Sequence, residues 1–218
     1  MKERPILFSA PMVRAILAGT KTQTRRLVNQ EAPDDADGCC WIDIEGVHQF
    51  AWVIGEDQDI HPSAAQFRCP YGQPGDRLWV RETHAPQADC WGAWERWSRG
   101  DGGVGPIIHY KASDEQAWVD RWRPSIHMPR WASRITLEVT AVRVERLKDI
   151  SAADCLAEGI DLHPSHHEKP RDSLYGPVQT YRDLWESING PGSWYANPWV
   201  WVVEFKKLEQ QHTGVESK

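Results

Sequence analysis

The sequence reads Leu17-Ala18-Gly19-Thr20-Lys21-Thr22-Gln23-Thr24-Arg25-Arg26 at the point where one predicted element ends and the next begins. Before this stretch, apolar residues recur at helical spacing and Ser9 is a candidate N-cap, which predicts a helix over residues 11–18. Gly19 suits the position just after that helix, because glycine accepts a left-handed backbone conformation. The residues that follow are β-prone and predict a strand over residues 22–28. The stretch therefore places an amine, a hydroxyl and two guanidinium groups just beyond a helix end.

Lys21 and Thr24 are the first candidate site residues. A lysine beside a hydroxyl can act as a base next to a nucleophile, although the same pair is also common on protein surfaces. Side chains alternate in a regular strand, so Lys21 and Thr24 would point to opposite faces unless a turn or bulge lies within residues 20–23. Arg25 and Arg26 are candidates for binding an anion, and the alternative for both is a solvated strand face.

Composition restricts the kind of partner. The 218 residues suit one large domain, or one domain with an insertion, and 40% hydrophobic and 26% charged residues are typical of a globular protein. A net charge of −6 argues against a protein that coats nucleic acid through general electrostatics. A local basic pocket formed by Lys21, Arg25 and Arg26 is still compatible with that charge. Its partner would be a small anionic or nucleobase-bearing molecule, or a short RNA.

The sequence favours a cytoplasmic protein without a membrane anchor. The first residues lead directly into an apolar strand rather than a signal peptide, and the longest apolar run, residues 198–203, is too short to span a bilayer. The five cysteines form an odd set without paired spacing, which favours reduced thiols and no zinc site. They are Cys39, Cys40, Cys69, Cys90 and Cys155.

The clearest strand covers residues 134–147. Its apolar alternation changes phase near residues 140–141, which predicts a bulge that would bend the strand around a barrel. Ser151 with Asp154 forms a capping-box signature for a helix over residues 152–158 that ends at Gly159, and a third helix is expected over about 178–188. Further strands are predicted at 6–8, 41–54 (a hairpin), 77–83, 107–110 and 199–205. Several strands with about three helices predict an α+β fold built on a mixed β-barrel.

Tryptophan is unusually frequent, with thirteen residues in the chain. Seven lie between positions 79 and 131, namely Trp79, Trp91, Trp94, Trp97, Trp118, Trp122 and Trp131. We interpret residues 84–123 as a Trp-rich insertion in a single domain over residues 1–209, followed by a flexible tail over 210–218. Most of these side chains are expected to fill a core, and the alternative is stacking on nucleobases.

The motif Gly19-Thr20-Lys21-Thr22-Gln23-Thr24-Arg25-Arg26 resembles the signature of ASCH-domain proteins, a branch of the PUA-like β-barrel superfamily. Supporting blocks are residues 75–82, the long strand into residues 147–151, Ala157-Glu158-Gly159 and residues 197–205. Together these blocks frame most of the chain. The chain is most similar to the larger, phage- or prophage-associated members, in which residues 84–123 would elaborate the barrel.

The resemblance implies binding of RNA or nucleotides in a cleft beside the barrel. Some small bacterial members are N4-acetylcytidine amidohydrolases that use a lysine, a threonine and a glutamate. Lys21 and Thr24 match that Lys-x-x-Thr spacing, and Glu158 is the best match for the glutamate, with Glu82 as a competing carboxylate. The present chain is about twice the length of those enzymes. Other members are described as ribonucleases with a different residue set.

The expected function is therefore an amidohydrolase that removes an acyl group from N4-acylated cytidine or a related modified nucleoside. Lys21, Thr24 and Glu158 would be catalytic. The substrate would be bound by Arg25, Arg26, Glu82 and Trp79, with no metal, organic cofactor or obligate protein partner implied. Alternatives are a module that binds RNA or a modified nucleotide without turnover, and a ribonuclease.

Each carboxylate also has a structural alternative. Glu82 could form an ion pair with Arg81 or Arg134, and Glu158 could be an ordinary solvated residue at a helix end. A glutamate at the C-terminal end of a helix is poorly placed against the helix dipole, which hints at a specific partner. Burial would lower the pKa of Lys21 whereas Glu158 would raise it, and the sequence leaves that balance open.

Overall fold

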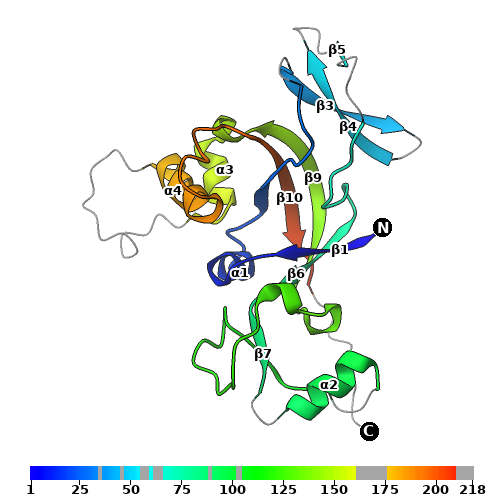
Figure 1. The fold of residues 1–218 in the computed structure, drawn as a ribbon, viewed down its shortest axis with the longest axis vertical. Coiled ribbons are helices and arrows are strands. Elements are labelled where there is room, and N and C mark those ends of the chain that lie inside the picture. The colour runs from blue at the N-terminus through cyan, green and yellow to red at the C-terminus, as the bar shows by residue number, and fades with distance from the viewer. Residues whose placement is uncertain are drawn as a thin grey trace. The chain divides into compact units, whose positions relative to one another are not determined.

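The computed structural model describes residues 1–33, 36–44, 47–54, 59–60, 66–87, 90–101, 105–160 and 176–209. The chain divides into two compact units. Unit 1 contains residues 1–18, 76–138 and those from 206 onward, and unit 2 contains residues 19–75 and 139–205. The described residues form four α-helices and ten strands, so the predicted mixed α+β class is confirmed (Figure 1).

Unit 1 is built on β1 (Glu3–Leu7), β6 (Arg77–Arg81) and the beginning of β9 (Thr136–Arg146). β1 runs parallel to β6, and β6 runs antiparallel to β9 with Leu78 opposite Leu137. Both leucines are fully buried, as the alternating burial of β6 requires. Helix α1 (Ala10–Leu17) starts after Ser9 and buries Val13 and Ile16.

The Trp-rich part of unit 1 contains a helix that the sequence analysis missed. Helix α2 (Trp91–Arg99) ends at Gly100, and beside it the short strands β7 (His84–Pro86) and β8 (Ile108–Tyr110) pair antiparallel. Trp94 is 4% exposed and packs with Met128 and Ala132, so this indole fills a core as predicted. Trp118, by contrast, is 72% exposed.

Unit 2 contains β2 (Gln23–Leu27), the rest of β9 and most of β10 (Trp199–Lys207). β10 lies between β9 and β2 and is antiparallel to β2, with Val203 opposite Thr24. Helices α3 (Ala152–Ala157) and α4 (Pro177–Asn189) lie side by side (Figure 1). Between them they bury Cys155, Tyr181 and Trp185 against residues of β10.

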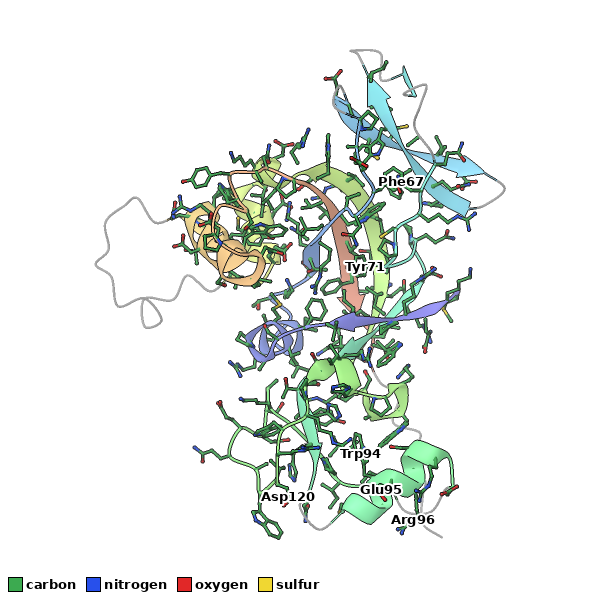
Figure 2. All side chains as sticks on the ribbon, in the orientation of Figure 1. Phe67, Tyr71, Trp94, Glu95, Arg96 and Asp120 are labelled. Atoms are coloured by element: carbon green, nitrogen blue, oxygen red, sulfur yellow. The ribbon has the colours of Figure 1, made fainter. Side chains whose placement is uncertain are left out.

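A second sheet of unit 2 consists of β3 (Gly38–Ile44), β4 (Val47–Ile54) and β5 (Asp59–Ile60). The predicted hairpin over residues 41–54 corresponds to β3 and β4, whose turn lies outside the described residues. Phe50 and Phe67 pack near the ring of Trp201, at centroid distances of 4.8 and 5.6 Å. Figure 2 labels Phe67 and Tyr71, which belong to this aromatic part of unit 2.

The predicted barrel is not found. Among the described residues the sheets are open, whereas a barrel requires every strand to pair on both edges. Within its own unit β1 pairs with β6 alone, and β2 pairs with β10 alone. The bulge expected near residues 140–141 stays a prediction, because the register recorded for β9 covers Thr136–Glu138.

Several local predictions are confirmed. Asp154 N donates to Ser151 Oγ and the Asp154 carboxylate accepts from Ser151 N, which completes the capping box of α3.

The predicted polar loop over residues 161–176 and the tail over 210–218 fall almost wholly outside the described residues. No helix in the described ranges has the length and apolar character needed to cross a membrane.

Candidate functional site

The turn after α1 determines where Lys21 lies. Gly19 has φ +78°, in the left-handed region, which confirms its predicted position after the helix. The chain then continues extended: Lys21 forms a β-bridge with Glu158, and Thr22 N donates to Ala157 O at 2.8 Å. A short antiparallel contact therefore brings the start of β2 to the end of α3.

Lys21 and Glu158 form a buried ion pair. Lys21 Nζ donates to Glu158 Oε2 at 2.7 Å and to the Glu158 backbone carbonyl at 2.8 Å. The exposed fractions of the two side chains are 0% and 5%. The structure thus joins two predicted catalytic residues that are 137 positions apart, and the solvated alternative for Glu158 is wrong.

Arg25 binds the same glutamate. Its Nη1 lies 3.4 Å from Glu158 Oε1, while Nε and Nη2 bind Glu145 Oε1 at 3.1 and 2.5 Å. The side chain of Arg25 is completely buried, so the solvated alternative is wrong for Arg25. A carboxylate held by an arginine and a lysine keeps a fixed orientation.

These residues belong to a larger set, here called the ionic cluster, that lies entirely within unit 2. Its members are Lys21, Arg25, Arg143, Glu145, Asp154, Glu158 and Glu204. Three cations and four carboxylates give a formal charge of −1 when all are ionised. Exposure rises along the cluster, from 0% for the Lys21 side chain to 23% for Asp154 and 38% for Arg143.

Burial and charge oppose each other at Lys21. Burial lowers the pKa of Lys21, and the Glu158 carboxylate raises it, with the net direction downward. The positive charges of Arg26 and Arg25 lower it further. A lysine with a lowered pKa can lose its proton more easily than a solvated one, and this property is what a general base requires.

At Asp154, hydrogen bonds and charge outweigh burial in setting the pKa. Burial raises its pKa, but hydrogen bonds from Ser151 and Gln23 and the charge of Arg25 outweigh that effect and hold the pKa at about 2. Gln23 Nε2 donates to both the side chain and the backbone carbonyl of Asp154 at 3.1 Å. Asp154 is therefore a permanent anion at neutral pH and serves to orient Gln23, Arg25 and Arg143.

Thr24 is buried but is not bound to Lys21. It lies between Gln23 and Arg25 in β2, so it occupies the opposite face of the strand, together with Arg26. Among the described residues no hydrogen bond joins the Thr24 hydroxyl to Lys21 Nζ. Arg26 is half-buried, and its charge lowers the pKa of Tyr71 against the larger raising effect of burial. The predicted roles of Thr24 and Arg26 stay predictions.

Glu82 and Trp79 belong to unit 1. Glu82 accepts two hydrogen bonds from Arg134, at 2.9 and 3.0 Å, which is the structural ion pair offered as the alternative for this residue. The half-buried ring of Trp79 carries the guanidinium groups of Arg81 and Arg130 at 5.3 and 5.9 Å. Their substrate-binding roles stay predictions.

Sequence reasoning missed Glu145, Arg143 and Glu204, and it noted Asp154 only as a helix cap. Lys21, Gln23 and Arg25 alternate along one extended segment, as do Arg143 and Glu145 in β9, so each set shares a face. Polar residues on one face of a strand with many apolar neighbours predict buried partners. This pattern indicates which strand faces need polar partners, but it does not identify the partners.

No metal-binding geometry occurs among the described residues, judged by groups of three or more His, Cys, Asp or Glu side chains. All five cysteines are free thiols. Comparisons with protein-family models, with curated proteins and with solved structures give no match for this chain.

Proposed function

We propose that the Lys21–Glu158 pair is the proton-transfer centre of an amidohydrolase that removes the acyl group from N4-acylated cytidine or a related modified nucleoside. The observation that carries the proposal is the 2.7 Å contact between Lys21 Nζ and Glu158 Oε2. The ASCH resemblance predicts this pair from sequence blocks that are far apart. The same proposal includes a relationship of this chain to the PUA-like superfamily. The open sheets of this chain would then correspond to the barrel of that superfamily.

The proposed reaction consumes one water and releases a carboxylic acid and cytidine. Lys21 in its neutral form takes a proton as water attacks the acyl carbon, and the bond from that carbon to N4 then breaks. The proton passes through Glu158 to the departing N4 amine. Arg25 holds Glu158 in place through its Nη1 at 3.4 Å from Oε1. No metal or organic cofactor takes part, and the setting we expect is the cytoplasm.

The test is release of cytidine from N4-acetylcytidine by the purified full chain, followed by chromatography. Lys21→Met and Glu158→Gln should each abolish release while the protein stays folded by circular dichroism. Lys206→Met is the matched control, because it removes another lysine ion pair, one in which the lysine side chain is 60% exposed. The proposal is wrong if high enzyme concentrations leave N4-acetylcytidine unchanged and also leave cytidines with a panel of other N4-acyl groups unchanged.

Thr24 has a separate test. The resemblance assigns it a catalytic role, either as the nucleophile or by positioning the water, and its place on the opposite face of β2 argues for neither. Thr24→Val keeps the shape of this 3%-exposed side chain and removes the hydroxyl, while Thr24→Ser keeps the hydroxyl. Activity in the serine variant alone would support a catalytic hydroxyl. Activity in both variants would exclude it.

A second candidate is a module that binds RNA or a modified nucleotide without turnover. The enclosure of the site argues against turnover, because the side chains of Lys21 and Arg25 are 0% exposed and both are paired. RNA binding that weakens steeply with salt, without release of cytidine, would support this candidate over the hydrolase. Cleavage of the RNA would instead support the ribonuclease alternative.

A further inference from the structure

Unit 1 contains a pocket that plays no part in the proposed hydrolysis. Its volume is about 390 Å³, within the range of small-molecule sites. It is lined by Arg121, Trp122, Arg123, Pro124 and His127. These side chains are half-buried or exposed, so the pocket opens to solvent. All of them come from one short segment that leads into the 3-10 turn Ser125–His127.

The charge of the lining is positive. Two guanidinium groups and an imidazole line a single pocket, and the part of its lining that the structure describes contains no carboxylate. Burial lowers the pKa of Arg123, the charge of Arg121 lowers it further, and Glu95 opposes both effects. Like charges held together raise the free energy of the unliganded protein, and a bound anion relieves that repulsion.

Arg123 is held in a fixed position. Its backbone N and O exchange hydrogen bonds with His84, at 2.8 and 3.2 Å. Its guanidinium lies over the ring of Trp94 at 4.9 Å, and that ring also stacks on the imidazole of His84 at 5.3 Å and packs on Trp131 at 4.9 Å. Trp94, labelled on α2 in Figure 2, is buried. A cation anchored in this way loses little conformational entropy when it binds an anion.

Trp122 adds a flat apolar surface to the same pocket. Its indole is half-buried beside Pro124, and an indole face accepts any planar heterocycle by stacking. Arginine binds a phosphate group through the planar fork of its N–H donors. The lining therefore combines arginines that can bind a phosphate with an indole that can stack on a ring. The volume of the pocket suits one small molecule.

We infer that this pocket binds a nucleoside monophosphate, with Arg121 and Arg123 on the phosphate and Trp122 on the base. The inference does not rest on the proposed hydrolase, because every residue involved belongs to unit 1 and the test measures binding alone. The ligand class follows from the charge, the aromatic surface and the volume of the pocket.

Isothermal titration calorimetry of the full chain tests the inference, with cytidine and adenosine 5′-monophosphates, inorganic phosphate and the two free nucleosides as probes. A nucleotide should bind at least about tenfold more tightly than phosphate or its nucleoside, since two sets of contacts act together. Arg121→Gln should weaken binding at least about tenfold, and Trp122→Leu should weaken the nucleotide but not phosphate. Arg14→Gln, the same change on an exposed residue of α1, should leave binding unchanged.

Four outcomes would overturn the inference. They are no binding at millimolar nucleotide, equal affinity for nucleotide and inorganic phosphate, full affinity in the Arg121 variant, and binding of oligonucleotides but not of mononucleotides. Arg121 is exposed, so its variant is expected to fold, and Arg123→Lys provides a second variant that keeps the charge but loses the forked geometry.

Discussion

Each unit of the molecule buries a glutamate, and the two carboxylates are satisfied in different ways. In unit 1, Arg134 supplies the paired hydrogen bonds that hold Glu82, whose side chain is 2% exposed, and no second cation pairs with it among the described residues. In unit 2, Glu158 is 5% exposed and is shared between Lys21 and Arg25 within the ionic cluster. The degree of burial is similar, whereas the number and kind of cations differ.

The difference separates a fixed charge from an exchangeable proton. An arginine guanidinium is a fixed charge that binds through a rigid fork of donors, whereas a lysine amine can exchange a proton when it is buried. Lys21 can lose its proton, because burial lowers its pKa despite the neighbouring carboxylate. A buried ion pair is weak evidence for stability or for function by itself. The lysine in the second pair is what makes chemistry available there.

The largest expected effect tests the dependence of Glu82 on a single partner. Arg134→Met leaves a buried carboxylate without its cation and removes the guanidinium from the ring of Tyr110, 4.0 Å away. We expect the free energy of unfolding to fall by about 3 kcal/mol or more. Urea denaturation followed by tryptophan fluorescence measures it. Arg130→Met is the control, because its pair with Glu3 is about 40% exposed on both sides.

A loss below about 1 kcal/mol for Arg134→Met would break the comparison. Glu82 would then have found another partner, and the two glutamates would no longer differ in the way described.

Lys21→Met should cost less than Arg134→Met, since Arg25 still binds Glu158 at 3.4 Å. We expect a loss of about 2 kcal/mol in the same denaturation experiment, because one cation of a shared set is removed rather than the only one. A cost that exceeds that of Arg134→Met would mean that Lys21 is the main structural support of Glu158, and would favour a structural role for the pair.

Two glycines allow a matched test of whether the turn at Gly19 positions Lys21. Gly19, before Lys21, has φ +78°, and Gly100, after α2, has φ +81°; a Cβ added to either would meet nothing within 4 Å. Gly19→Ala and Gly100→Ala should therefore each cost about 1 to 2 kcal/mol, from backbone strain alone. Only Gly19→Ala should also slow the release of cytidine. Equal activity in both variants would contradict the positioning of Lys21 by this turn.

The smallest expected effect is on the unfolding free energy at low pH. The pKa of Asp154 is about 2 in the folded protein against an ordinary value of 3.8. Its stabilising contribution is thus complete above pH 3.8 and is lost as the pH falls toward about 2. Asp154→Asn should flatten the decline of the unfolding free energy across that range, measured by urea denaturation at stepped pH. An unchanged slope would place the acid sensitivity in other carboxylates.

The elements with clear periodicity or caps were predictable. Helix α3 was found from Ser151, Asp154 and Gly159, β6 and β9 were found from alternating apolar residues, and β10 was expected as the closing strand over residues 199–205. Helix α2 was missed because it is short and contains Gly92, although Trp91, Trp94 and Trp97 stand at helical spacing. The barrel was inferred from the bulge expected near residues 140–141 and from several strands with few helices, and such local patterns do not determine which strand edges meet.

The candidate site was predictable in part. Lys21 was a candidate from its position beside a hydroxyl after a helix end, Glu158 was named from the resemblance, and the two do meet at 2.7 Å. The rest of the ionic cluster was not predicted, since Glu145, Arg143 and Glu204 are ordinary charged residues until β9 and β10 place them near Arg25 and Asp154. Which residues fill a buried polar space depends on long-range packing, and no single sequence displays it.

The β-bridge between Lys21 and Glu158 also bears on how the protein is made. The two residues are 137 positions apart, so the pair closes a long loop and depends on contacts of high sequence separation. At a synthesis rate of about 5 to 20 residues per second, roughly 7 to 30 s pass between the synthesis of Lys21 and Arg25 and the synthesis of Glu158. During that interval both cations remain hydrated and bury nothing. Assembly of the site is therefore a late event that reports completion of the chain through α3.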